Sequence, residues 1–213
     1  SLLATSAAHL HLVEKRKRMQ IDIVVESAEP REVMHFALLF GFGANAVNPY
    51  LVFGVLAEQV KTGEIPVDLA TAKKNYIKSV NEGLLKVLSK MGNSTLRSYR
   101  GAHIFESIGL ASSLMNTYFK GISSKIEGID LEEVAREAWQ PFFEAFEEDE
   151  NEPFHLENNG RYAYRVNGDY HAWNPETISK LQTAVRTGDY GLFKEYTALV
   201  DQKEKPAFIR DLF

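Results

Sequence analysis

Residues 22–49 read DIVVESAEPREVMHFALLFGFGANAVNP, and this stretch decides the fold. Its first five residues, 22–26, are short, β-branched and bounded by polar residues, which predicts a buried strand. Residues 31–40 follow a proline and precede two glycines, so we expect a helix there. Residues 46–48 form a second short strand before another proline. Strand, helix and strand in so few residues predict a βαβ crossover with parallel strands, and hence an α/β fold.

Helices are expected on both sides of this unit, because apolar residues recur there three or four positions apart. The one over 130–146 is expected to be kinked or split before Pro141. A third strand is predicted over 94–99, with a helix over 102–108 behind it. The remaining predicted helices of this part cover 2–14, 50–61, 69–91 and 112–119.

The C-terminal third has a different character. Six of the nine residues from Glu144 to Glu152 are acidic. This run indicates a solvated linker, taken as 149–159, between a first part, 1–148, and a second part, 160–213. Asn167-Gly168 lies between two aromatic runs and predicts a β-hairpin. The hairpin tyrosines could stack on a ligand or pair across the strands. Asn174 is expected to cap a helix that runs to Arg186 and is stopped by Gly188, and a last helix is predicted over 190–200.

Composition limits the chemistry. The chain of 213 residues has no cysteine, which removes disulfides, thiolate metal sites and cysteine nucleophiles from this chain. Its formal charge is −5, so nucleic acid is a poor partner. The longest apolar stretch, 36–60, is interrupted by glycines and polar residues, so no membrane span is expected. Ser1 stands where a start methionine would, without a basic leader, and we expect an internal piece that is not secreted.

Several motifs suggest a site but have a structural explanation. His9 and His11 lie two apart on a predicted helix and so point to different faces, which disfavours a metal pair. His35 is expected to be a core or capping histidine. The glycines at 41 and 43 follow a helix and precede a strand, whereas a dinucleotide loop has the reverse order, so we expect a helix stop.

The candidates for a cofactor or anion site are Lys90, Ser94, Arg100 and His103. Lys90 and Ser94 belong to a turn that could hold an anion or could end a helix with capping hydroxyls, and the helix end is favoured. Arg100 and His103 belong to a polar cluster with Arg97, Tyr99 and Glu106, for which a salt-bridged structural corner is the favoured interpretation. No Ser-His-Asp arrangement, HExxH or Walker signature is present, so no catalytic residue is assigned.

Five segments in fixed order carry a family resemblance: 24–37, 41–51, 75–78, 83–95 and 98–106. They resemble the central domain of glutamate synthase large subunits. Residues 170–175 and the helix after them resemble the passage from that domain into the flavin-binding barrel. The sequence departs from the family pattern at Leu10, Met34, Asn93 and His103. Enzymes of this family have an ammonia tunnel, and if these positions line it, its lining is altered here.

The resemblance implies a function. The family makes two glutamates from glutamine and 2-oxoglutarate, using a glutaminase, an ammonia tunnel, FMN and an iron–sulfur cluster. By this resemblance, the chain is a degenerate Rossmann-like α/β layer that joins glutaminase to synthase site and supports the tunnel. Its partners are then the other domains of the same polypeptide, and its compartment the cytoplasm or the plastid stroma.

The resemblance also implies what the piece does alone. We expect it to be inactive and to hold no cofactor, because the principal flavin and 2-oxoglutarate contacts should lie after Phe213. Exposed former interfaces would let it self-associate. The alternative is a piece that still binds FMN or an anionic metabolite through residues 90–100.

Overall fold

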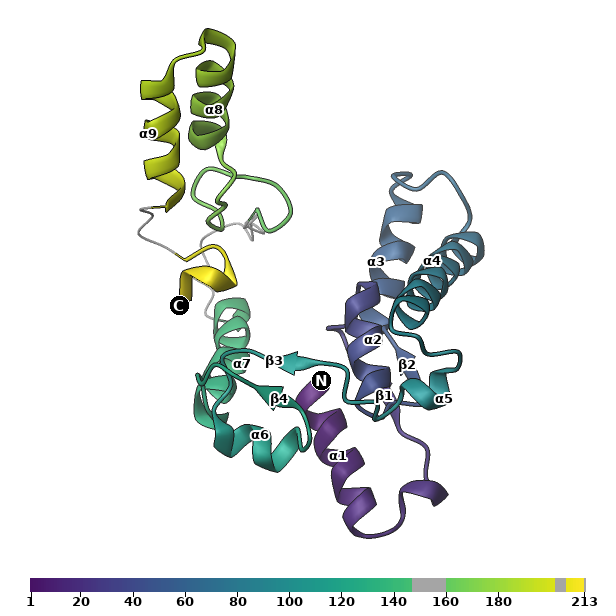
Figure 1. The fold of residues 1–213 in the computed structure, drawn as a ribbon. Helices are drawn as coiled ribbons and strands as arrows, with labels where there is room; N and C mark the ends of the chain where they lie inside the picture. Colours follow the sequence, from purple (N-terminus) through teal and green to yellow (C-terminus); the bar gives the residue numbers. More distant parts are fainter. Residues whose placement is uncertain (147–159, 202–205, 213) are drawn as a thin grey trace. The chain divides into compact units, whose positions relative to one another are not determined.

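The computed structural model describes residues 1–146, 160–201 and 206–212 (Figure 1). The chain divides into two compact units, 1–147 and 148–213, and each is described by itself. The predicted linker, 149–159, lies outside the described residues, and the domain boundaries stay a prediction.

The βαβ unit predicted from residues 22–49 is present. Strand β1 (Val24–Glu26) is followed by helix α2 (Val33–Gly41) and strand β2 (Ala46–Asn48). The two strands pair in parallel, with Val25 opposite Val47. Beneath them Val25, Leu39 and Ala44 form a buried cluster. The α/β assignment is thus confirmed, with short two-stranded sheets in place of one extended sheet.

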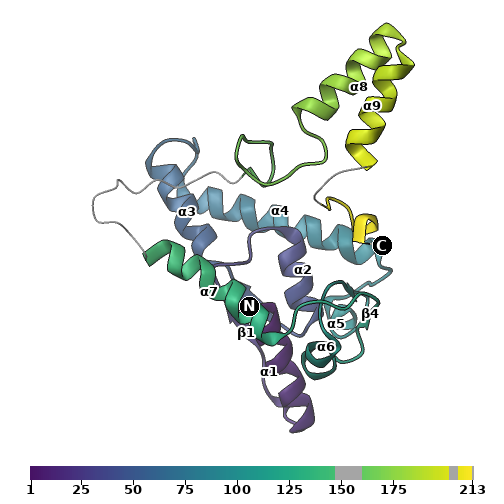
Figure 2. The same cartoon turned by 90° about the vertical axis from the view of Figure 1, so that its left-hand side faces the viewer.

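Three longer helices surround this unit, as the sequence predicted: α1 (Leu2–Glu14), α3 (Tyr50–Lys61) and α4 (Leu69–Lys90). Helix α4 begins where the Asp68 carboxylate accepts a hydrogen bond from the Thr71 amide. Helices α2 and α4 lie side by side (Figure 2). They approach closely at Gly83, where an added Cβ would lie 2.4 Å from Val33 Cγ2.

Two predictions after α4 are wrong. Residues 94–99 are not a strand: Leu96–Tyr99 form the short helix α5, because the Thr95 hydroxyl accepts a hydrogen bond from the Ser98 amide and caps it. Residues 102–108 are not a helix, because the φ of His103 is +52°, outside the right-handed helical region. The chain instead enters strand β3 (Glu106–Ser107).

A second, smaller crossover follows. Strand β3 leads through α6 (Ser112–Tyr118) to β4 (Ser123–Ser124), and β3 and β4 pair in parallel. Helix α7 (Leu131–Phe146) comes next and continues through Pro141, so the expected split is wrong. The proline removes a single intrahelical donor, and the helix continues past it. Val134 of α7 packs on the buried cluster Leu114, Met115 and Phe119.

The second unit contains a helix pair but no hairpin. No strand occurs among residues 160–201 and 206–212. A type I′ turn needs positive φ at two residues, and only Asn167 has it (φ +64°), so the predicted β-hairpin is wrong. Helices α8 (Pro175–Thr187) and α9 (Tyr190–Asp201) pack antiparallel (Figure 1). Asn174 caps α8, and Gly188 ends it in the left-handed conformation, both as predicted.

The remaining elements are two 3₁₀ turns, η1 (Arg18–Gln20) and η2 (Ile209–Leu212). Within the described ranges, every helix is either too short or too polar to cross a membrane.

Candidate functional site

The first unit contains a cavity of about 420 Å³ lined by three arginines. We call it the arginine pocket. Its arginines come from segments far apart in the sequence: Arg18 from turn η1, Arg97 from α5, and Arg100 just after α5. The other lining residues are His9, Met19, Asp22 and Asn45.

Arg18 lines this pocket and is held in place by four hydrogen bonds. Its Nε donates to His9 Nδ1 at 3.0 Å, and Nη1 donates to the Ile21 carbonyl at 2.7 Å. Nη2 donates to the Gly43 carbonyl and to Asn45 Oδ1, both at 2.7 Å. All four acceptors are neutral, so the guanidinium is fixed without losing its charge to a carboxylate.

The positive charge of the pocket exceeds the negative charge of the residues that line it. In the parts of the chain that the structure describes, none of the ion pairs includes Arg18, Arg97 or Arg100. The Nε of Arg100 is buried and has no hydrogen-bond partner among the described residues. Asp22 is the one lining carboxylate, and it accepts a hydrogen bond from Asn45 Nδ2 at 2.5 Å. Three guanidiniums therefore face one carboxylate.

His9 forms one wall and is kept neutral. Burial lowers its pKa, and the positive charges of Arg18 and Arg100, with His103, lower it further. Its Nδ1 accepts from Arg18, so protonation there would break that bond. The wall also requires a glycine at 43: with φ +117°, an added Cβ would lie 2.4 Å from His9 Nδ1.

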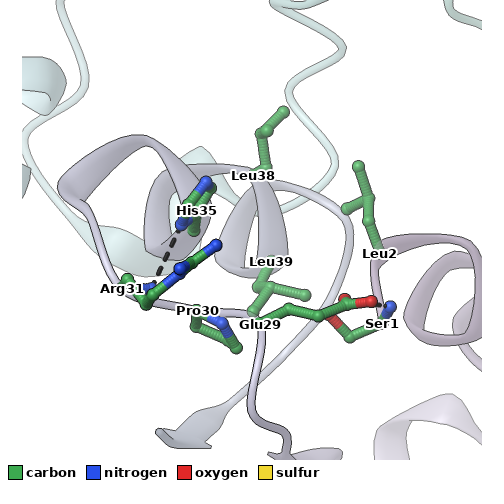
Figure 3. Close-up of a pocket in the computed structure, with 8 residues that line it drawn as sticks. All are labelled: Ser1, Leu2, Glu29, Pro30, Arg31, His35, Leu38 and Leu39. Atoms are coloured by element: carbon green, nitrogen blue, oxygen red, sulfur yellow. Dashed lines mark hydrogen bonds and ion pairs between the residues drawn. The ribbon is translucent and has the colours of Figure 1, made fainter. Parts of the chain in front are cut away.

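A second cavity, of about 270 Å³, lies at the start of α2 and has a structural explanation (Figure 3). There His35 Nδ1 accepts from the backbone amides of Arg31 and Glu32, at 3.1 and 3.3 Å. This is a reciprocal cap at the α2 N-terminus, and it confirms the capping role predicted for His35. Glu29, also at this cavity, accepts a hydrogen bond from the Ser1 ammonium group.

The four candidate residues from the sequence are not brought together. Arg100 lines the arginine pocket, whereas His103 lines an adjoining cavity of about 40 Å³ that shares His9 with it. Lys90 and Ser94 are exposed and line none of these cavities. The expected salt-bridged corner is absent among these residues, since Glu106 pairs with Lys125 instead, at 3.5 Å.

Sequence reasoning missed Arg18 and His9 as members of one site. Arg18 ends the basic run Lys15 to Arg18, which the sequence alone explains as complementing the negative end of the α1 dipole. The signal in the sequence is the position of Arg18 between α1 and β1. A turn at this point brings its side chain back against α1. The described residues contain no cluster of three or more metal-ligating side chains.

The fold and pocket define an α/β domain built on a parallel βαβ unit with a cationic recess and no assigned catalytic group. The sequence profile of the family "Glutamate synthase central domain" matches residues 1–111. The chain belongs to this family.

Whole-chain relatives agree. The chain is 45% identical to the NADPH glutamate synthase large chain of Bacillus subtilis, covering 100% of this chain and 14% of the relative. It is 40% identical to the ferredoxin-dependent glutamate synthase of Pyropia yezoensis, over 99% of this chain and 14% of the relative. It is 37% identical to the NADPH glutamate synthase large chain of Azospirillum brasilense, over 100% of this chain and 14% of the relative. The chain thus spans about one seventh of the length of these relatives.

Proposed function

We propose that this chain is a linking segment of a glutamate synthase. In this account, the whole polypeptide converts glutamine and 2-oxoglutarate to two glutamates, and this segment joins the glutaminase to the flavin site and supports the ammonia tunnel between them. The segment supplies packing surfaces and no catalytic group.

The observation that carries the proposal is an aromatic face on α7. Trp139, Phe142, Phe143 and Phe146 are 55%, 51%, 49% and 72% exposed. They contact one another along the helix, with ring centroids 4.7 Å apart for Phe142 and Phe146. A connected apolar face of this kind is uncommon on a monomer and indicates a contact surface.

The length of the relatives indicates what covers this face. The chain spans 14% of the Bacillus subtilis large chain, so most of that polypeptide lies outside this segment. Val134 anchors α7 to the first unit, which leaves the aromatic end free to pack on another domain of the same chain.

The cofactors of such an enzyme would be held elsewhere in the polypeptide. The chain has no cysteine, so it cannot supply thiolate ligands to an iron–sulfur cluster. We propose that the principal FMN contacts also lie outside this segment.

Self-association of the isolated chain tests the aromatic face. We expect sedimentation velocity to show concentration-dependent association, because two copies can bury the face that another domain normally covers. Phe142→Gln should weaken this association severalfold. Glu137→Gln, an exposed position on the same helix, should leave it unchanged. A chain that stays monomeric at high concentration, or two variants that behave alike, would contradict the proposal.

A further inference from the structure

The arginine pocket has the properties of a binding site, and the linking role does not use it. The pocket gathers three arginines, although the formal charge of the whole chain is −5. Three guanidiniums and one carboxylate leave a local excess of two positive charges. Because like charges repel, three guanidiniums around one cavity favour the binding of an anion.

The pocket also has unused hydrogen-bond donors. Arg18 keeps a free N–H on Nη1, since its other four donors are taken. Arg100 Nε is buried and unpartnered. Buried donors are rarely left unsatisfied in native proteins, and such an orphan calls for a ligand, ion or water.

The shape of these donors selects the ligand chemistry. Guanidinium groups present planar pairs of N–H donors that match the two oxygens of a carboxylate or phosphate. A volume of about 420 Å³ falls within the usual size of small-molecule sites. Because Arg18 is already held by four hydrogen bonds, little ordering is needed on binding.

We propose that the arginine pocket binds the oxyanion group, carboxylate or phosphate, of a small soluble molecule. Arg97 provides exposed donors, half-buried Arg100 provides an unused one, and Arg18 adds a charge already fixed by its own hydrogen bonds. The site is distinct from the turn at Lys90 and Ser94, and it goes beyond the linking role.

Titration of the full 213-residue chain tests this site. Inorganic phosphate and succinate are added separately at constant ionic strength, and the ring resonances of His9 report on the pocket. Saturable shifts with either anion are expected, and the stronger of the two identifies the phosphate or carboxylate source. Chloride at the same ionic strength should produce no saturable shift.

Matched variants locate the binding. Arg97 is exposed, so Arg97→Gln should leave the fold intact while weakening binding about tenfold, the usual effect of losing one charged hydrogen bond. Lys90→Gln removes the same charge outside the pocket and should not change the affinity. Circular dichroism confirms folding of both variants.

Three results would overturn the proposal: no saturable shift with phosphate or succinate, an equal response to chloride, or equal weakening by Lys90→Gln and Arg97→Gln. The aromatic face of α7 is not involved, so this outcome is independent of the linking role.

Discussion

Tyr99→Ala is expected to lower the free energy of unfolding of the first unit by about 3–5 kcal/mol, the range for removing a large buried aromatic side chain. Tyr99 is 1% exposed. It belongs to the buried cluster with Ala37 and Leu88, and its ring packs edge-on against Phe105 at 6.1 Å. The substitution therefore leaves a cavity where α2, α4 and α5 meet. Urea unfolding followed by circular dichroism measures the loss.

Tyr99→Phe is the control for this prediction. The Tyr99 hydroxyl is buried and finds no hydrogen-bond partner in the part of the chain that the structure describes, and burial raises its pKa. Removing a hydroxyl that makes no bond should leave the free energy of unfolding unchanged or slightly increase it. A large loss in Tyr99→Phe would show that the hydroxyl has a partner, and a small loss in Tyr99→Ala would show that the ring is not part of the core.

The second large effect on stability is expected from alanine substitution of two helical glycines, one closely packed and one in open space. At Gly83 in α4 an added Cβ would lie 2.4 Å from Val33 Cγ2 and 3.2 Å from Val33 Cβ, so α2 and α4 must separate. We expect Gly83→Ala to destabilise the unit by about 1–3 kcal/mol, as overpacking does. At Gly54 in α3 nothing lies within 4 Å.

Gly54→Ala should therefore stabilise the unit, by about 0.5–1 kcal/mol, because alanine loses less conformational entropy in a helix. Thermal unfolding of both variants tests these two predictions. If both alanines stabilise the unit, α2 and α4 do not pack closely at Gly83. If both destabilise it, helix propensity does not determine the effect of the substitution at Gly54.

Local patterns predicted the parts of the fold that depend on local chemistry. The βαβ unit, the cap at Asn174 and the stop at Gly188 were predictable, because proline, glycine and capping side chains act within a few residues. The segment 94–99 was not, since weak alternation suggested a strand while the Thr95 cap and burial of Tyr99 favoured a helix. Likewise Asn167-Gly168 forms a turn without strands beside it.

The arginine pocket could not be predicted because it combines distant segments. Arg18 and Arg97 are far apart in sequence, and only the tertiary fold brings turn η1 and helix α5 to one cavity. Arg100 was identified as a candidate by its polar neighbours, but Lys90 and Ser94 are exposed and do not line the pocket.

The coupling of two activities in a full-length glutamate synthase carrying this segment is the most direct test of the linking role. Three rates are compared for Phe142→Gln and the control Glu137→Gln: glutamine hydrolysis, glutamate formation from added ammonia, and glutamate formation from glutamine. A linking segment predicts that Phe142→Gln lowers the third rate severalfold and leaves the first two intact, while Glu137→Gln changes none of them. If all three rates stay unchanged in Phe142→Gln, or fall together, the segment does not link the two sites through this face.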